Sequence, residues 1–306
     1  MLLGTNSTMT KPTILIAGAT GYLGSRLLRS LVESGQYDCA VLKRCTSSLD
    51  RIDDLLPAIR TFDIDRDGLA APFDAGPVEI IVNCATNYGR GPTGREATIA
   101  ANLTFPLGLL DAANRHGAAM FVQADTSLPP DVSDYALAKH QFGQWLDRSA
   151  GPALRVRLRL EHFFGPGDDA SKFVAYVINT MVTSAPKLPL TPGDQLRDFV
   201  YVDDVVDAFR TVIESRRDFE PGAHQFPVGS GVGTRIRDLV TTVKQLTDNQ
   251  TTDIDFGAVA YRDNEVMRSV ADLTNISHLA WRPQTSLEDG LRQTIDFERQ
   301  RLGRVA

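Results

Sequence analysis

The chain has 306 residues, of which 42% are hydrophobic and 23% are charged, and its formal net charge is −6 at pH 7. These are ordinary globular values, with room for one large or two moderate domains. The acidic balance gives no reason to expect nucleic acid or an anionic membrane as a partner.

The start of the chain and its cysteines predict the cellular setting. Residues 1–12 have neither the basic start nor the apolar centre of a signal peptide, and either Met1 or Met9 could be the native start. No apolar run reaches the ~18–20 residues of a membrane span. Cys39, Cys45 and Cys84 lack the spacing of metal ligands or of a disulfide framework. We therefore expect reduced thiols, no metal and a cytoplasmic protein.

The first regular element is the apolar run 14–17, which is typical of a buried strand in a parallel sheet. Three glycines at intervals of three follow it, and a helical pattern then runs to Ser34. Such a loop lets the backbone approach a pyrophosphate, and the amides at the helix start can hold the anion. A plain strand-turn-helix corner is the alternative. The residues expected to bind a dinucleotide here are Gly18, Thr20, Gly21, Tyr22, Leu23 and Gly24.

The second predicted strand, 38–42, ends at residues that select the cofactor. NAD-binding enzymes carry an acidic residue about 20 positions after the glycines, where it binds the ribose hydroxyls. This chain has Lys43 and Arg44 there, followed by the hydroxyl residues 46–48. Two cations beside small hydroxyls suit a 2′-phosphate, so we expect NADP(H). A solvated basic turn is the alternative.

The next elements complete the first half of the chain. A short helix is predicted over 48–56, and strands are predicted over 59–64 and 78–84. Apolar residues at helical spacing predict one long helix over 97–116. The glycine-rich loop 87–93 lies between the last of these strands and that helix, at the expected mouth of a substrate site.

The fifth predicted strand, 120–124, leads into Thr126, and an amphipathic helix begins at Tyr135. Tyr135 and Lys139 are four residues apart and therefore lie on one face of that helix. A lysine in this place lowers the pKa of the tyrosine from its usual ~10, and it can hydrogen-bond a nicotinamide ribose. We expect Thr126, Tyr135 and Lys139 to be catalytic; an ordinary pair of helix residues is the alternative.

Strands and helices continue to alternate in the second half. We expect Asp203 or Asp204 to cap the helix over 205–215. The elements predicted in this half are strands over 153–160, 187–190, 225–229 and 254–256, and helices over 171–184, 205–215, 235–247 and 287–300.

The spacing Gly-x-x-Gly-x-x-Gly resembles that of the extended short-chain dehydrogenase/reductase superfamily, which contains nucleotide-sugar epimerases, dehydratases and reductases. The Tyr-x-x-x-Lys pair, Gly-Pro-Gly at 165–167 and Arg-Asp-Phe-x-x-Val-Asp-Asp-Val at 197–205 also match. The resemblance implies an α/β fold, with an NADP(H)-binding Rossmann domain over 12–160 built on a doubly wound parallel sheet. It further implies a smaller α/β domain over 161–306, mainly for the substrate, from which 197–229 returns to the main sheet.

The same resemblance implies further site residues and a homodimer. The helices 97–116 and 135–148 would pair across a two-fold axis, with Leu110, Phe142 and Trp145 in the contact. Two arginines would meet the diphosphate of a nucleotide sugar. For Asp63, Asn102 and His162 a purely structural role is the alternative, because an aspartate at a strand end, a helix asparagine and a lone histidine are common as structural residues. The implied residues are Asp63, Ile64, Ala85, Thr86 and Asn102 for the cofactor, and Tyr88, His162, Arg197 and Arg268 for the substrate.

The residues around Thr126 narrow the implied chemistry. Family dehydratases carry Asp-Glu after the matching threonine, whereas Ser127 and Leu128 follow it here. The segments 43–47, 125–129, 135–139 and 160–162 resemble nucleotide-sugar 4-ketoreductases of the CDP-abequose synthase type. This implies NADPH-dependent reduction of a nucleotide-diphosphate-linked 4-keto-6-deoxy or 3,6-dideoxy sugar in deoxysugar biosynthesis. An epimerase with retained NAD(P) and a catalytically idle NADP-binding regulatory protein are the alternatives.

Overall fold

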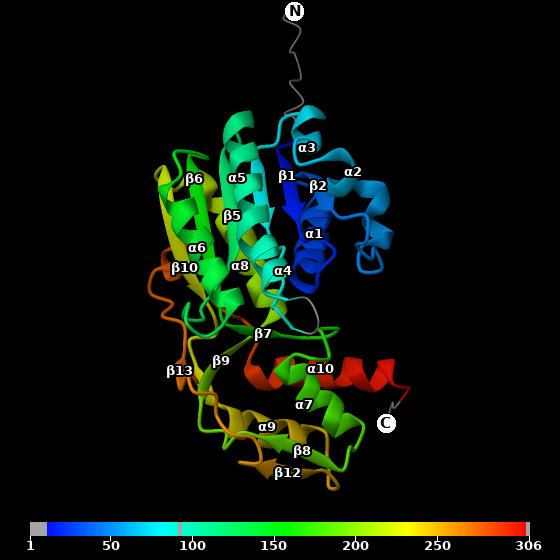
Figure 1. Ribbon diagram of the computed structural model, residues 1–306. Coiled ribbons are helices and arrows are strands. Elements are labelled where there is room, and N and C mark those ends of the chain that lie inside the picture. The colour runs from blue at the N-terminus through cyan, green and yellow to red at the C-terminus, as the bar shows by residue number, and fades with distance from the viewer. Residues whose placement is uncertain (1–10, 91–93, 304–306) are drawn as a thin grey trace, which may run out of the picture.

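The computed structural model describes residues 11–90 and 94–303, so the two candidate starts and residues 91–93 of the glycine-rich loop lie outside the described residues. A seven-stranded sheet forms the larger part of the molecule (Figure 1), and all of its strands run parallel. In spatial order its strands are β10 (Gly222–Val228), β6 (Leu154–Leu160), β5 (Met120–Thr126), β4 (Ile80–Asn83), β1 (Thr13–Ala17), β2 (Asp38–Lys43) and β3 (Arg60–Asp63).

This strand order is doubly wound. The chain starts at β1 in the middle of the sheet, moves outward to β3, and then returns to β4 on the other side of β1. Ligands of such sheets bind outside the carboxyl ends of the strands, at the point where the order reverses. The predicted α/β class is therefore confirmed, and the β1–β4 boundary is where a site is expected.

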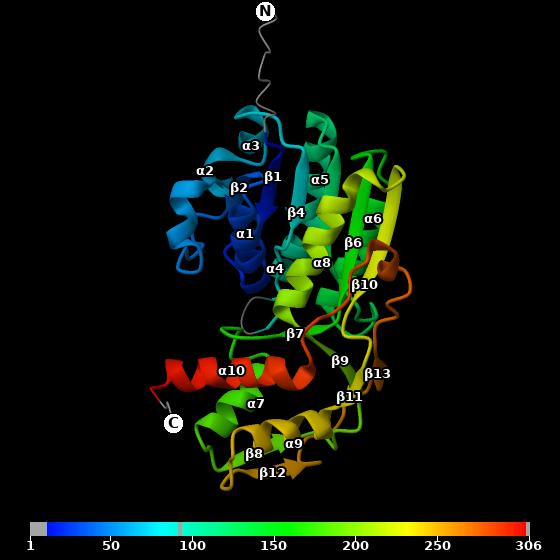
Figure 2. The same cartoon turned by 180° about the vertical axis from the view of Figure 1, so that it is seen from behind.

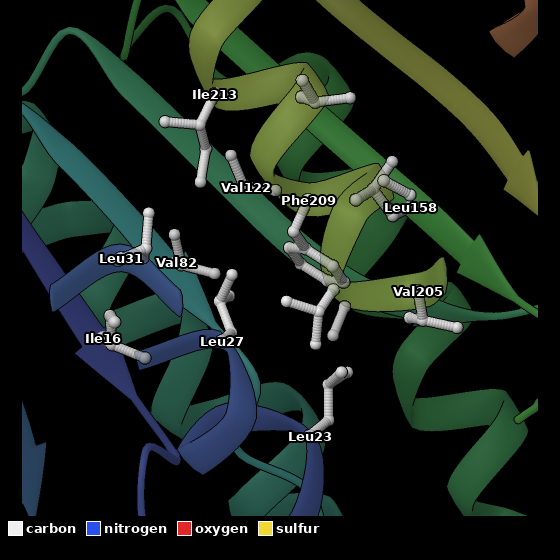
Figure 3. Packing of buried hydrophobic residues seen from close by; sticks show 14 of the residues in the cluster. Ile16, Leu23, Leu27, Leu31, Val82, Val122, Leu158, Val205, Phe209 and Ile213 are labelled. Atoms are coloured by element: carbon white, nitrogen blue, oxygen red, sulfur yellow. The ribbon is translucent and has the colours of Figure 1, made fainter. Parts of the chain in front are cut away.

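Helices cover both faces of the sheet, as the two opposite views show (Figures 1 and 2). Ile14 and Ile16 belong to one buried cluster with residues of α1 (Tyr22–Ser34) and α8 (Val202–Glu214). Figure 3 shows Ile16 near Leu27 of α1, with Phe209 and Ile213 of α8 farther along the same layer. Leu15 and Ala17 pack with α5 (Phe105–His116) and α6 (Asp134–Arg148). Successive side chains of a strand point to opposite faces, so the unbroken apolar run fills both layers.

The long helix predicted over 97–116 is interrupted by a wide turn. The segment α4 (Arg95–Ile99) passes through the π-helical turn η2 (Ala100–Thr104) into α5. Turns of this kind are frequent at functional sites. In place of the helix predicted over 48–56, the chain forms the 3₁₀ helix η1 (Asp53–Ala58), and the short helices α2 (Ile64–Asp67) and α3 (Ala71–Asp74) follow.

The smaller part of the molecule has its own sheet and core. The strand β9 (Leu196–Tyr201) pairs with β7 (His162–Phe164), β11 (Gly233–Arg235) and β13 (Arg268–Ser269). A separate pair joins β8 (Lys187–Leu190) to β12 (Asp253–Phe256). The helices of this part are α7 (Phe173–Val182), α9 (Ile236–Leu246) and α10 (Leu287–Arg301). Two 3₁₀ segments belong with the large sheet: η3 (Ser215–Arg217) directly follows α8, and Ile276 of η4 (Ile276–Leu279) is buried in the core of the large sheet. The chain returns to the large sheet through α8 and β10.

The capping role expected of Asp203 or Asp204 is wrong. Helix α8 begins before both residues and has no side-chain cap. The Asp204 carboxylate accepts the backbone N–H groups of Gln284 and Thr285 at 2.9 and 3.1 Å. Asp203 instead pairs with Arg26 of α1 at 2.8 Å. These aspartates therefore join α8 to segments far away in the chain.

The role predicted for three apolar residues in a dimer contact is also wrong for two of them. Leu110 and Phe142 are buried against the sheet of their own chain. Helical spacing identifies an apolar face without saying what covers it, and here the sheet covers it. Trp145 is 59% exposed, and Leu137 on the same helix is 43% exposed.

Two properties of the described residues bear on partners. Within 11–90 and 94–303, no helix is long and apolar enough to cross a membrane. Over the same ranges, no three His, Cys, Asp or Glu side chains gather as metal ligands would. All three cysteines are free thiols.

Candidate functional site

The glycine loop forms a tight corner between β1 and α1. Gly18 has a φ of +78°, and a Cβ there would overlap the backbone of Ala85 after β4. A Cβ on Gly24 would overlap the Gly18 carbonyl. Gly21 is exposed and stands at the start of α1, which has no side-chain cap and no acidic residue in its first turn. The helix start can therefore receive an anion, and the pyrophosphate of a dinucleotide fits it.

The two cations predicted to bind a 2′-phosphate, Lys43 and Arg44 at the end of β2, have different partners. Lys43 Nζ pairs with the Oδ2 atom of buried Asp63 at 3.1 Å, so much of its charge is balanced by the protein. The other oxygen of Asp63 caps α2 by accepting the N–H of Asp65. Arg44 is exposed, and its backbone N–H donates to Ser47 Oγ while its carbonyl accepts the Ser47 N–H, both at 3.1 Å. Within the described residues its guanidinium makes no hydrogen bond or ion pair. Arg44 is thus the cation better placed to receive a phosphate.

Asn102, in the wide turn of the long helix, fixes the segment that follows β4. Its Nδ2 group donates to the carbonyls of Asn87 and Thr98 at 2.7 and 2.8 Å. Its Oδ1 atom accepts the Thr86 hydroxyl at 3.0 Å. Asn102 is buried, so these bonds satisfy an amide that would otherwise be costly to bury. It is not the exposed helix asparagine that was the alternative.

Thr126 and Tyr135 meet at the carboxyl end of β5, where Thr86 joins them. The hydroxyls of Thr126 and Thr86 both lie within hydrogen-bonding reach of the Tyr135 hydroxyl. The ring of Tyr88 lies against that of Tyr135, with centroids 5.0 Å apart. Burial raises the pKa of Tyr135 above its usual value of 10.0, although the two threonine hydroxyls act in the opposite direction. The phenol is therefore protonated at neutral pH.

The lowered tyrosine pKa expected from Lys139 is accordingly wrong, and the position of the ammonium group explains why. Lys139 is only 2% exposed, and its Nζ donates to the carbonyls of Ala124 at 2.8 Å and Ala85 at 3.4 Å. Burial lowers the pKa of Lys139 from 10.5 to about 8, although Asp125 and Cys84 favour its charged form. The lysine thus joins the ends of β4 and β5, one turn of α6 away from the phenol.

Three of the predicted substrate residues belong to the smaller sheet, whereas Tyr88 lies at the large one. His162 opens β7, with its ring edge-on to Phe199 and its Nδ1 atom 3.8 Å from Glu161 Oε2. Glu161 is buried and accepts the Ser269 hydroxyl at 2.8 and 3.1 Å. The histidine is half-exposed above this buried carboxylate.

The two predicted diphosphate ligands lie on neighbouring strands, because β13 pairs with β9. Arg268 is exposed on β13. Arg197 on β9 is buried, and its Nη2 atom pairs with Glu265 Oε1 at 2.6 Å. A substrate anion that reaches Arg197 would have to compete with this carboxylate.

Sequence reasoning missed two features of the site. It assigned Thr86 to the cofactor and did not foresee that its hydroxyl reaches Tyr135, since the two residues are joined only by the pairing of β4 with β5. It also gave no role to Lys172, which contacts the ring of Tyr88. No local pattern marks either contact, so neither could have been found from spacing.

Similarities to known proteins agree with this geometry. The model of the NAD dependent epimerase/dehydratase family matches residues 14–229. The chain is 29% identical to CDP-abequose synthase of Salmonella typhimurium, over 94% of this chain and 99% of that protein. It is 28% identical to CDP-abequose synthase of Salmonella muenchen, over 93% and 97%. A crystal structure of UDP-glucose 4-epimerase with UDP-glucose, from Thermotoga maritima, has the same fold, with a TM-score of 0.82 at 23% identity over 95% of this chain and 99% of that one.

Proposed function

This chain belongs to the NAD dependent epimerase/dehydratase family, and from that premise we propose that it reduces a nucleotide-diphosphate-linked 4-keto sugar with NADPH. The substrate would be a 4-keto-6-deoxy or 4-keto-3,6-dideoxy sugar, and the product its 4-hydroxy form. The similarity to two CDP-abequose synthases over nearly the whole chain supports nucleotide-sugar modification in deoxysugar biosynthesis.

The observation that carries the proposal is the protonated Tyr135 hydroxyl, held by Thr126 and Thr86. Reduction of a ketone requires a hydride at carbon and a proton at oxygen, and NADPH would supply the hydride when bound. A phenol that keeps its proton at neutral pH is suited to donate it to the developing alkoxide. A Thr126 hydroxyl bonded to the same oxygen would polarise the carbonyl.

The other side chains would then hold the reactants. Lys139 has the reach to bind a nicotinamide ribose from its place between the ends of β4 and β5. The exposed Arg44 guanidinium suits the 2′-phosphate of NADPH, which an arginine can grip with two hydrogen bonds. Arg197 and Arg268, on adjacent strands, suit the diphosphate of the sugar nucleotide.

Two related reactions fit the site less well. A dehydratase of the resembled type has Asp-Glu after the threonine, and this chain has Ser127 and Leu128. An epimerase gains from a tightly held NAD, whereas Lys43 and Arg44 stand where NAD-binding enzymes carry an acidic residue. The likeness to UDP-glucose 4-epimerase extends to the fold alone, at 23% identity.

The test is to incubate the purified protein with NADPH and a set of nucleotide 4-keto-6-deoxy sugars that differ in base and in deoxygenation. A ketoreductase oxidises one NADPH for each sugar reduced and prefers NADPH to NADH. Interconversion of two 4-hydroxy sugars without net loss of reduced cofactor would establish an epimerase instead.

Tyr135→Phe tests the assignment of the proton donor, because it removes only the hydroxyl. We expect kcat to fall ~100–10,000-fold, the usual contribution of a positioned acid, while the Kd for NADPH hardly changes. Thr126→Val should reduce kcat less than Tyr135→Phe does. We expect it to raise the activation free energy by about 2–4 kcal/mol at most. Near-normal turnover of Tyr135→Phe would show that the proton comes from another group, with His162 and Tyr88 the next to test.

A further inference from the structure

Lys172, directly before α7, lies among aromatic rings from three separate segments of the chain. Its Nζ atom is 4.5 Å from the ring centroid of Phe163, 5.4 Å from that of Tyr22 and 5.5 Å from that of Tyr88. It also pairs with Asp168 Oδ1 at 3.0 Å. The Asp168 side chain is 3% exposed and that of Lys172 is 19% exposed, so the pair is largely removed from water.

These rings connect the two halves of the proposed reaction site. Tyr22 is the first residue of α1, next to the exposed Gly21 of the glycine loop. Tyr88 lies against the ring of Tyr135. The ammonium group of Lys172 therefore contacts both the residue that opens the cofactor-binding helix and the residue that packs on the proton donor.

A second cation attaches the Tyr88 segment to the same place. The Arg90 guanidinium lies 5.5 Å from the Tyr88 ring centroid. Its Nη1 atom donates to the carbonyl and hydroxyl of Ser171 at 3.2 and 3.3 Å. Residues 168–172 thus hold the segment after β4 through one cation–π contact, from Lys172 to Tyr88, and two hydrogen bonds, from Arg90 to Ser171, although 81 positions separate Arg90 from Ser171 in sequence.

The buried ion pair of Lys172 and Asp168 is better explained by its effect on the position of the Lys172 side chain than by a contribution to stability. Burying two charges costs about as much as their attraction returns, so such pairs add little to stability compared with apolar residues of the same size. What Asp168 does here is to fix the direction of the Lys172 side chain, which is otherwise long and flexible. The ammonium is thereby kept over the rings.

We propose that Lys172 is a positioning residue: it holds Tyr88 against Tyr135 and so fixes the proton donor relative to the cofactor loop. The proposal rests on the proposed function only in taking Tyr135 as the proton donor. Lys172 acts through Tyr88 and not by touching the reacting atoms. A direct contact of Lys172 with the substrate anion is the competing explanation, and the kinetics separate the two.

The kinetic test uses Lys172→Met, which keeps the long apolar stem and removes the charge. We expect kcat to fall about threefold to thirtyfold, the factor that corresponds to losing a cation–π contact of ordinary strength, with KM for the sugar nucleotide unchanged. Lys172→Arg should restore most of the rate. Lys187→Met, at an exposed lysine on β8 of the same part, is the matched control and should have no effect. A raised KM with normal kcat would overturn the proposal in favour of direct substrate binding.

A double-mutant cycle shows whether the effect passes through Tyr88. In a Tyr88→Leu background, Lys172→Met should reduce kcat no further, because the ring that it positions is gone. Equal losses in both backgrounds would mean that Lys172 acts by another route and would refute the proposed role.

A measurement without substrate separates failure of this proposal from failure of the proposed function. The protein is labelled with 3-fluorotyrosine, and the fluorine resonances of Tyr88 and Tyr135 are assigned with the corresponding Tyr→Phe variants. Lys172→Met should shift both resonances, and the shift at Tyr135 is decisive because Tyr88 lies between them. An unmoved Tyr135 resonance overturns the proposal whatever the activity. Shifted resonances in a protein that reduces no keto sugar would leave the positioning intact and reject the function.

Arg90→Met provides the same test if Lys172→Met fails to fold, because Arg90 is exposed. It removes the other cation from the Tyr88 ring and the bonds to Ser171. We expect a shift of the Tyr88 and Tyr135 resonances and a smaller loss of kcat; no shift in either resonance would contradict the proposed role of this contact.

Discussion

Replacing Lys139 with methionine should stabilise the folded protein at pH 7 while it removes activity. Burial lowers the pKa of this lysine from 10.5 to about 8. At ~1.4 kcal/mol per pKa unit, the charged side chain costs the folded state about 3 kcal/mol of free energy of unfolding at neutral pH. Methionine has a similar length and no charge, so it removes this cost.

The lost hydrogen bonds offset part of the gain. The Ala124 carbonyl keeps a second donor, Gln123 Nε2 at 2.8 Å, when Lys139 is replaced. The Ala85 carbonyl loses a donor at 3.4 Å, but it is half-buried, so its loss lies at the low end of the ~1–3 kcal/mol for an unsatisfied group. Asp125 keeps its ion pair with Arg157 at 3.0 Å. The expected net stabilisation is ~1–2 kcal/mol.

The sign of the pH dependence follows from the lowered pKa. Between about pH 8 and 10.5 the unfolded chain binds more protons than the folded one, so wild-type stability rises with pH across this window. Below it, the cost of burying the charge is fully present. The advantage of Lys139→Met is therefore largest at neutral pH and shrinks toward pH 10.

Urea unfolding of the wild type, Lys139→Met and the exposed-lysine control Lys187→Met, at several pH values between 7 and 10, measures this effect. The midpoint for Lys139→Met should exceed that of the wild type at pH 7, and the two should converge as the pH rises. A variant that is less stable than the wild type at pH 7, or a stability difference that does not change with pH, would show that burying the charged form of Lys139 does not destabilise the folded protein.

Two further predictions concern the cofactor and the assembly. Arg44→Asp should weaken NADPH binding about tenfold or more, the contribution of a hydrogen bond to a charged group, and leave NADH binding nearly unchanged. Lys43→Met should have a smaller effect because Asp63 already balances the charge of Lys43. Equal losses of affinity for both cofactors in isothermal titration would reject a 2′-phosphate site. We also expect a homodimer through the exposed face of α6, where Trp145 and Leu137 lie. Light scattering at micromolar concentration should give twice the chain mass for the wild type and a monomer for Trp145→Glu. A monomeric wild type would refute the interface.

The parts of this fold that could be predicted from sequence are those that depend on neighbours along the chain. The apolar run 14–17 and the glycines after it specify a buried strand, a tight corner and a helix, and each is present. The spacing of Tyr135 and Lys139 places both on one helix, which is also present. The 3₁₀ helix at 53–58 contains Pro57, which directly follows the segment 48–56 where a regular helix was expected and disfavours the α conformation of the residue before it.

The parts that could not be predicted depend on partners that are distant in sequence. Asp204 was expected to cap a helix because it directly precedes the apolar pattern predicted over 205–215, yet its carboxylate accepts backbone N–H groups 80 and 81 residues later. Phe142 looked like a dimer contact because it belongs to an apolar helix face, yet the sheet of the same chain covers that face. In both cases the local pattern gives the correct chemical preference, and only the tertiary fold decides which partner meets it.

The pKa of Tyr135 shows how such a difference changes a mechanism. Four-residue spacing makes Lys139 a neighbour of the phenol, and from this alone a stabilised phenolate follows. In the structure the ammonium is bound to the carbonyls of Ala124 and Ala85, and burial dominates at the phenol. A phenolate would favour removal of a proton, and hence oxidation of an alcohol, whereas a protonated phenol favours proton donation to a ketone oxygen. In the proposed reduction, the phenol kept protonated by burial at the end of β5 would be the proton donor, a state that the Tyr-x-x-x-Lys spacing alone does not specify.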